Sequence, residues 1–433
     1  MSILFKERLK SFNNKDLLSY KKNPIKHKGY ILSLLKNTLQ EDEKRDYYLQ
    51  CCLDTAIDLH RKNSFFIEEK KQKVSFGVIR FSLVDSCIEC SRYFLNANIP
   101  NDIEIRVLPY HSRQILLLRH EIEDHLEEVL CRKEGFEQAI KNHIIDKHIE
   151  NSKKENIVFI MVCTSIEEVG RDHDFNWAVL EPSSYRSLIQ MLGRVLRHTT
   201  IEQDIQEYNF TMMEYTLRGY LRGKESPYIP PYSLIKDSGI QNKLPGDIFE
   251  IPYNSFKLFN EDSLRDASFK IDILKTPKDY SDIKNLSELE HYNHYKYLCD
   301  DTSYGPENGM GYFEGFWGFT ALPSCIHKFR ASSLEHTVFC KYEEGEITFV
   351  EKDSDGTVYP VKNVFNINLA EKLTSEENAR LWIHLDYKKL LSKWGNDDLT
   401  KSSLKYGELQ LPIYNLDVQS SFTYCFQLGL KKC

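Results

Sequence analysis

The sequence predicts an α/β protein in which a doubly wound parallel sheet spans residues from about 74 to 200 and an α+β domain follows. First, strand-like apolar segments alternate four times with helical segments in this region. Second, NIVFIMVCT (156–164) is apolar on both faces, as strands covered by helices on both sides require. Third, the amino-acid composition changes after about residue 200, where ESPYIPPYSLIKDSG carries three prolines and is typical of a linker.

Each element of the predicted sheet can be placed in chain order. Strands are predicted at VSFGVIRFS (74–82), IEIRVLPYHS (103–112), 156–164 and NWAVLEP (176–182). Helices are predicted at LVDSCIECSRYFLN (83–96), LLLRHEIEDHLEEVLCRK (116–133) and EPSSYRSLIQMLGRVLRH (181–198). In such sheets ligands bind beyond the carboxyl ends of the strands, where Thr164 lies.

The flanking segments are assigned in the same way. YILSLLKNTL (30–39) and YYLQCCLDTAIDLH (47–60) have helical periodicity, and a charged break at 67–73 separates them from the sheet. Towards the C-terminus, HTVFCKYEEGEITFVEKDSDGTVYPVKNVF (336–365) predicts strands joined by a DSDG turn. SEENARLWIHLDYKKLLSKWG (375–395) predicts one helix.

Composition excludes several classes of protein. The chain has 433 residues and a formal net charge of −7, so nucleic acid could bind only in a local basic groove. There is no apolar stretch of membrane length and no signal peptide, and the eleven scattered cysteines predict free thiols in a reducing cytoplasm. We therefore expect a cytoplasmic protein with no membrane partner.

The segment 181–198 raises a functional question. On a helix Leu188, Leu192 and Val195 fall on one side, and Gln190, Arg194 and Arg197 fall roughly on the opposite side. That polar face is either a solvated outer face or a binding face.

The loop TSIEEVGRDHDFNW (164–177) is equally ambiguous alone, because it could bind a ribose or phosphate or could be a polar turn. Together the two segments are more specific, because this loop, a strand and then Gln-x-x-Gly-Arg-x-x-Arg occur in order. QMLGRVLRH matches the sixth motif of superfamily-two helicases, and the loop matches their fifth. Gly193 supports the match, since a glycine within a helix costs about 1 kcal/mol and needs a local reason.

A closer resemblance extends over about 55 to 225. VSFGVIR, PYHSR, SIEEVGRDHDFNWAVLEPSSYRSLIQMLGRVLRH and EYTLRGYLRG, in this order, resemble the CRISPR-associated nuclease–helicase of type I-F systems, and similarity continues weakly towards the C-terminus. The resemblance implies a RecA-like second helicase domain with a parallel sheet, followed by a C-terminal α+β domain. Together with the change in composition after residue 200, this predicts four segments: a helical N-terminal segment packing on the motor (1–72), the RecA-like domain (73–225), a linker (226–245) and an accessory domain (246–433).

The resemblance also implies an activity, cofactors and partners. Members of this family are recruited by an RNA-guided surveillance complex, reel in the displaced single-stranded DNA using ATP with Mg²⁺, and cut it. Arginines suit such a site because a planar guanidinium can meet phosphate oxygens and stabilise charge on the γ-phosphate.

Carried over by motif, the residues fall into three groups. Arg194 and Arg197 would face the γ-phosphate; Gln190, Gly193, Gly170 and Asp172 would bind ATP; Thr164, His111, Ser112 and Arg113 would contact the DNA.

Several motifs of the family do not occur in this sequence. The family's HD nuclease domain, its GxxxxGK[ST] loop and its acidic Mg²⁺-binding motif are absent from this sequence, and GYLRGKES (219–226) is one residue short of such a loop. We expect the chain to supply the arginine half of an ATP site, to be inactive alone, and to need an N-terminal motor and nuclease half that carries the Mg²⁺ ligands. The alternatives are a non-catalytic module that docks on the surveillance complex or DNA, and a remnant without activity.

No metal site is predicted in the chain itself. CIEC (Cys87 and Cys90) has zinc-ligand spacing but no second pair, and His173–Asp174 lies in the motif-five loop without a further cluster. HIIDKHIE (143–150) is interpreted as a solvated helix face. The aromatic residues in GYFEGFWGF (311–319) could stack on bases or form core.

Overall fold

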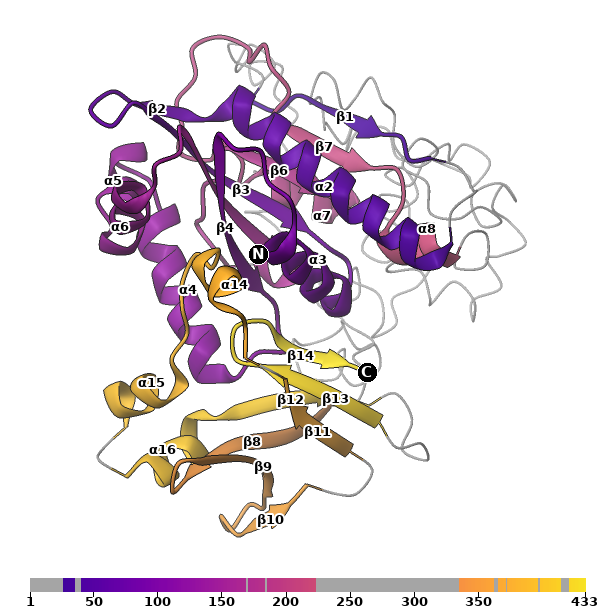
Figure 1. Cartoon of the computed structure of the whole chain (residues 1–433), viewed down its shortest axis with the longest axis vertical. Coiled ribbons are helices and arrows are strands. Elements are labelled where there is room, and N and C mark those ends of the chain that lie inside the picture. The colour runs from indigo at the N-terminus through magenta and orange to yellow at the C-terminus, as the bar shows by residue number, and fades with distance from the viewer. Residues whose placement is uncertain are drawn as a thin grey trace, which may run out of the picture.

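A sheet of seven strands, parallel along its main path, forms the centre of the molecule (Figure 1). The computed structural model describes residues 26–35, 40–168, 170–183, 185–222, 335–361, 365–370, 372–395, 398–413 and 420–433. The central strands are β1 (Gly29–Leu32), β2 (Phe65–Ile67), β3 (Gln72–Arg80), β4 (Ile103–Tyr110), β5 (Asn156–Cys163), β6 (Trp177–Leu180) and β7 (Phe210–Met213). Their order is β1-β7-β6-β3-β5-β4, every pair on this path is parallel, and β2 pairs antiparallel with β3.

Helices cover both faces of this sheet. One face carries α2 (Glu41–Asn63), α3 (Val84–Asn96) and α8 (Leu217–Arg222); the other carries α4 (Leu116–Leu130), α5 (Phe136–Ile140), α6 (His143–Asn151) and α7 (Tyr185–Leu192). Strand β5 shows why both faces need cover, because its side chains alternate between two cores. Ile157 and Phe159 join the core under α4 and α7, whereas Val158 and Ile160 join the core under α2 and α3.

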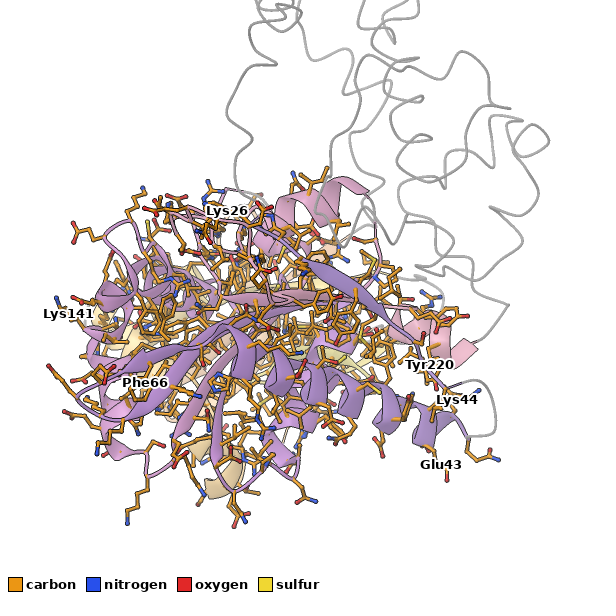
Figure 2. The ribbon with its side chains drawn as sticks, turned by 90° about the horizontal axis from the view of Figure 1, so that it is seen from above. Lys26, Glu43, Lys44, Phe66, Lys141 and Tyr220 are labelled. Atoms are coloured by element: carbon orange, nitrogen blue, oxygen red, sulfur yellow. The ribbon has the colours of Figure 1, made fainter. Side chains whose placement is uncertain are left out.

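The predicted α/β alternation between 74 and 200 is confirmed, and the N-terminal segment differs in part. Helix α2 forms as expected, with an acidic first turn and a basic last turn that complement the helix dipole. The prediction of a helix at 30–39 is wrong, because Tyr30–Leu32 belong to β1, which pairs in register with β7. Near the start of α2, Tyr220 of α8 packs on Tyr48 with ring centroids 5.9 Å apart, in the corner that Figure 2 marks with Glu43, Lys44 and Tyr220.

The C-terminal part adds two smaller sheets beyond one end of the central sheet (Figure 1). The first contains β8 (Glu335–Glu343), β9 (Glu346–Lys352), β10 (Val358–Pro360) and β12 (Glu408–Pro412); the second contains β11 (Phe365–Leu369), β13 (Ser420–Cys425) and β14 (Gly429–Lys432). Three short helices accompany them, namely α14 (Ser375–Ala379), α15 (Tyr387–Trp394) and α16 (Leu399–Tyr406). The predicted DSDG turn is confirmed between β9 and β10, where the Gly356 N–H donates to Asp353 O at 3.0 Å.

The prediction of one helix over 375–395 is wrong. The chain leaves the helical conformation after α14, and Leu381 forms an isolated parallel bridge with Val107 of the edge strand β4. The Val107 N–H donates to Arg380 O at 2.8 Å, and the Trp382 N–H donates to Val107 O at 3.0 Å. Helix α15 then begins after Asp386, which is its N-cap. The Asp386 side chain accepts a hydrogen bond from the Lys389 N–H.

The C-terminal part and the central sheet share one hydrophobic core. Trp382 is fully buried, and its ring lies 5.6 Å from that of Phe76 and 5.2 Å from that of Phe159. The ring of His148 on α6 adds a hydrogen bond to Trp382 O at 2.8 Å. The face of α6 that carries His148, which was interpreted as solvated, is therefore partly covered by the C-terminal part. The described residues 335–433 therefore continue the core under α4 and α7. The predicted linker at 226–245 and the aromatic segment at 311–319 lie outside the described residues.

None of the described helices combines the length and the apolar character needed to cross a bilayer.

Candidate functional site

The carboxyl ends of the central strands bring part of the predicted site together. Cys163, the last residue of β5, is in register with Arg80 at the end of β3 and with Tyr110 at the end of β4. The Thr164 N–H donates to Tyr110 O at 3.3 Å, so Thr164 and the loop that begins at His111 are neighbours. Thr164 is only 6% exposed. The predicted DNA-contacting residues are thus adjacent at one edge of the sheet.

The loop of residues 111–113 presents its three side chains differently. His111 is buried, and burial lowers its pKa to about 4, so the ring is neutral. Its Nε2–H donates to Leu428 O at 2.9 Å, because that oxygen can only accept, and its Nδ1 accepts the Arg113 N–H at 3.2 Å. Ser112 is exposed, while the Arg113 guanidinium forms an ion pair with Asp85 at 2.9 Å. The His111 ring is therefore buried in this structure, whereas Ser112 is exposed and Arg113 is partly exposed, and the predicted contacts with DNA stay predictions.

The segment before and within β14 fixes this loop from the C-terminal side. The Leu430 N–H donates to Arg113 O at 2.8 Å, and the Gln114 side chain donates to Phe426 O at 2.9 Å. Gly429 has φ +86°, and a Cβ there would lie 2.4 Å from the His111 ring and 2.7 Å from Arg113 O. Only glycine fits both the backbone conformation and the space.

We predict that Gly429→Ala loosens the 111–113 loop. The left-handed backbone costs an alanine about 1–2 kcal/mol, and the overlap with His111 adds about 1–3 kcal/mol. Gly356→Ala is the matched control, because Gly356 has φ +90° and open space around its Cβ position. Urea unfolding measures the two costs, and amide hydrogen exchange measures protection of the loop. Equal unfolding free energies and unchanged exchange at Arg113 and Ile115 would contradict this role.

The residues predicted to bind ATP gather elsewhere, where the loop after β5 passes the end of α7. That helix ends at Leu192, so the prediction that Gly193, Arg194 and Arg197 lie on one continuous helix is wrong. The chain turns after Gly193 and forms a bridge in which the Phe175 N–H donates to Arg194 O at 2.7 Å and the Leu196 N–H donates to Phe175 O at 2.8 Å. This bridge ties the motif-five loop directly to the motif-six arginines.

Arg197 and Asp172 form an accessible pair within this region. Arg197 Nε lies 2.5 Å from Asp172 Oδ1, and the two side chains are 39% and 28% exposed. Lys133 Nζ also donates to Asp172, at 2.9 Å, and these two cations hold the pKa of Asp172 well below its usual range. The buried carboxylate of Asp174 accepts the Arg197 N–H at 2.9 Å and so fixes the backbone that presents the guanidinium.

Arg194 has a different environment from Arg197. It is only 5% exposed, its Nη1 donates to Gln190 O at 2.9 Å, and its Nε lies 3.3 Å from Glu167 Oε1. Glu167 is fully buried and also lies 2.9 Å from His173 Nδ1. Burial lowers the pKa of Arg194, and the adjacent carboxylate opposes that shift. The expectation that Arg194 lies on a face away from the core is therefore wrong.

The remaining predicted ATP-side residues lie around these arginines. Gly170 is exposed with φ +73°, a conformation that favours glycine even though a Cβ there would meet nothing within 4 Å. Gln190 is half-buried on α7, and Gly193 is exposed just beyond the end of that helix. Gly193 therefore follows the helix and does not interrupt it.

One group among the described residues has metal-ligand chemistry. Potential ligand atoms of Cys131, Asp172 and His198 lie within 4.8 Å of one another. Lys133 and Arg197 already neutralise the Asp172 carboxylate, so this donor set does not favour a cation. Cys87 and Cys90 lie on α3 as fully buried thiols whose pKa values are raised by burial.

Sequence reasoning missed a buried ion pair at the strand ends. Arg80 Nε donates to Glu168 Oε1 at 2.9 Å, both side chains are 7% exposed, and Ser187 Oγ of α7 donates to Glu168 Oε2 at 2.9 Å. This network connects β3, the motif-five loop and α7. The signal was the acidic pair in TSIEEVG directly after a fully apolar strand, because a carboxylate there must find a cation when it is buried.

Comparisons with known proteins show what this chain resembles. Residues 73–200 match the family described as "CRISPR-associated nuclease/helicase Cas3, C-terminal". The chain is 32% identical over 227 residues to the CRISPR-associated nuclease/helicase Cas3 subtype I-F/YPEST of Pectobacterium atrosepticum, a match that covers 48% of this chain and 20% of the relative. It is 36% identical over 142 residues to the Pseudomonas aeruginosa protein of the same name, covering 33% and 13% of the two chains.

A solved structure of T. fusca Cas3 with AMPPNP is 13% identical, with a TM-score of 0.36, and the alignment covers 91% of this chain and 37% of that one. The two sequence matches cover only a fifth or less of the relatives' own lengths. The central sheet of this chain is mostly parallel and has helices on both faces, which is the α/β arrangement predicted from the sequence. Residues 73–200 thus match the model of the Cas3 C-terminal part, and up to 48% of the chain is similar in sequence to the type I-F CRISPR-associated nuclease/helicase Cas3.

Proposed function

We propose that this chain supplies the arginine half of the ATP site, and part of the DNA path, of an ATP-dependent DNA helicase or translocase in CRISPR antiviral defence. The observation that carries the proposal is the bridge between Phe175 and the residues around Val195, which holds the motif-five loop against the motif-six arginines. Asp172 and Arg197, 25 positions apart in sequence, meet through it at 2.5 Å.

The two groups of predicted residues lie on different parts of the domain, which suits their two roles. Thr164, Ser112 and Arg113 are at the carboxyl edge of the sheet, where the C-terminal part also packs. Arg197 and Asp172 are at the far end of α7, beside the last residues of α4, where the Asp174 N–H donates to Leu130 O at 3.0 Å. The loop of residues 164–176 would therefore contact both ligands: a DNA strand at the carboxyl edge of the sheet and a nucleotide beside the end of α7.

Arg197 is the side chain best placed to reach a nucleotide held by another domain. It is partly exposed and is held by Asp172 through a contact that a phosphate group can replace. Arg194 is buried beside Glu167, and it would hold the loop in the conformation that presents Arg197. Gly170, Gln190 and Gly193 would border the nucleotide.

ATP with Mg²⁺ would be held mainly by residues outside this sequence, which contains no GxxxxGK[ST] segment. When bound, the metal neutralises charge on the phosphates. The nuclease activity and recruitment by an RNA-guided surveillance complex would likewise depend on the N-terminal motor and nuclease half that the resemblance implies.

Hydrolysis of ATP stimulated by single-stranded DNA tests the proposal. We expect no turnover by the chain alone, and turnover when it is mixed with a polypeptide that carries the P-loop motor domain. Turnover by the chain alone would contradict the half-site assignment. Absence of turnover in both cases, with binding of DNA retained, would favour a non-catalytic docking module.

A further inference from the structure

An exposed aromatic surface lies beside the start of α4 and is not used by the proposed ATP site. It is formed by Leu116 and His120 of α4 together with Lys393 and Trp394 of α15, and we name it the Trp394 surface. Trp394 is 42% exposed and Leu116 is 39% exposed, whereas Trp177 and Trp382 are fully buried. An indole this exposed contributes little to the core and is available to a partner.

The rings and charges of this surface are arranged around the indole. The His120 and Trp394 ring centroids are 5.1 Å apart at an interplanar angle of 57°. Lys393 Nζ lies 5.4 Å from the centre of the Trp394 ring and 3.1 Å from Glu121 Oε2. Lys389, one helical turn earlier on α15, is also exposed.

The Trp394 surface continues the predicted DNA edge of the sheet. Helix α4 begins at Leu116, directly after the loop of residues 111–113, and Arg119 Nη1 donates to Ser112 O at 3.5 Å. His120 lies four residues along α4 from Leu116, which is about 6 Å along the helix axis. A strand that contacts Ser112 and Arg113 would therefore meet Trp394 next (α4 and α15 are neighbours in Figure 1).

Exposed aromatic rings beside lysines are suited to single-stranded nucleic acid, because any base has a π-face for stacking and the ammonium groups meet the phosphates. We propose that the Trp394 surface stacks bases of single-stranded DNA beyond the 111–113 loop, with Trp394 as the stacking ring and Lys389 and Lys393 as phosphate partners. This inference rests on the proposed function, since it extends the same DNA path.

Quenching of tryptophan fluorescence by oligo(dT) tests stacking directly, with binding measured in parallel by the anisotropy of a labelled oligo(dT). We expect oligo(dT) to quench the tryptophan fluorescence of the wild-type chain. The Trp394→Phe variant is expected to lose most of that quenching and still to bind oligo(dT), with a lower affinity than the wild-type chain. Trp394→Ala is expected to weaken binding about 5- to 150-fold. Tyr359→Ala is the matched control, because Tyr359 is a similarly exposed aromatic residue on the distant strand β10, at 45% exposure. It is expected to bind as wild type does.

The outcomes separate this inference from the proposed function. If the chain binds oligo(dT) but neither quenching nor affinity depends on Trp394, the inference is wrong and the proposed DNA path stands. If the chain binds no oligo(dT), both the DNA path and the inference are wrong. If sedimentation shows self-association that Trp394→Ala abolishes while DNA affinity is unchanged, the surface is an interface between copies of this chain and the inference is wrong.

Discussion

Arg197→Ala is expected to reduce DNA-stimulated ATP turnover of the completed motor by about 10³- to 10⁵-fold, the range that an arginine contacting the γ-phosphate contributes. The fold should be unaffected, because the Arg197 side chain is 39% exposed and packs no core. Steady-state hydrolysis with the P-loop polypeptide in excess measures kcat, and thermal unfolding of the chain measures stability.

Two other variants sharpen this test. Lys133→Ala removes the second cation on Asp172 and leaves Arg197 in place, so turnover is expected to change little. Arg194→Ala is expected to reduce turnover and also to destabilise the chain by about 3–5 kcal/mol, because it leaves the buried carboxylate of Glu167 with His173 alone. Full turnover by Arg197→Ala would remove Arg197 from the ATP site.

Much of the fold could be predicted because periodicity reports burial directly. The apolar run at 156–164 could only be a strand covered on both faces, and the structure has β5 at the interior of the sheet. The segment at 30–39 was misjudged because a short edge strand and an amphipathic helix give similar patterns, and only pairing with β7, about 180 residues later, decides between them. The pattern at 375–395 failed for the same reason, since the bridge between Leu381 and Val107 is a tertiary contact.

The sequence predicted which residues belong to the site but not how they are arranged in space. The resemblance named Arg194 and Arg197 together, and helical spacing placed them on one face. The turn after Gly193 separates them, so that one is buried beside Glu167 and the other pairs with Asp172 at the surface. The only sequence signal for the burial of Glu167 was its place directly after an apolar strand, and an acidic side chain in a loop is normally exposed.

Trp382→Ala is expected to lower the free energy of unfolding by about 3–5 kcal/mol. Its indole is fully buried against Phe76 and Phe159, at the point where the C-terminal part joins the core under α4 and α7. Among the described residues the Trp382 Nε1–H meets no acceptor, so Trp382→Phe is expected to cost much less than alanine.

Urea unfolding followed by circular dichroism and by fluorescence measures this effect. Trp394→Ala is the control on the same segment, and a change within about 0.5 kcal/mol is expected because that indole lies at the surface. Since the two parts share one core, the described regions are expected to unfold in a single transition that both probes report. Two separate transitions in the wild-type chain, or a Trp382→Ala variant as stable as Trp394→Ala, would show that the C-terminal part folds on a core of its own.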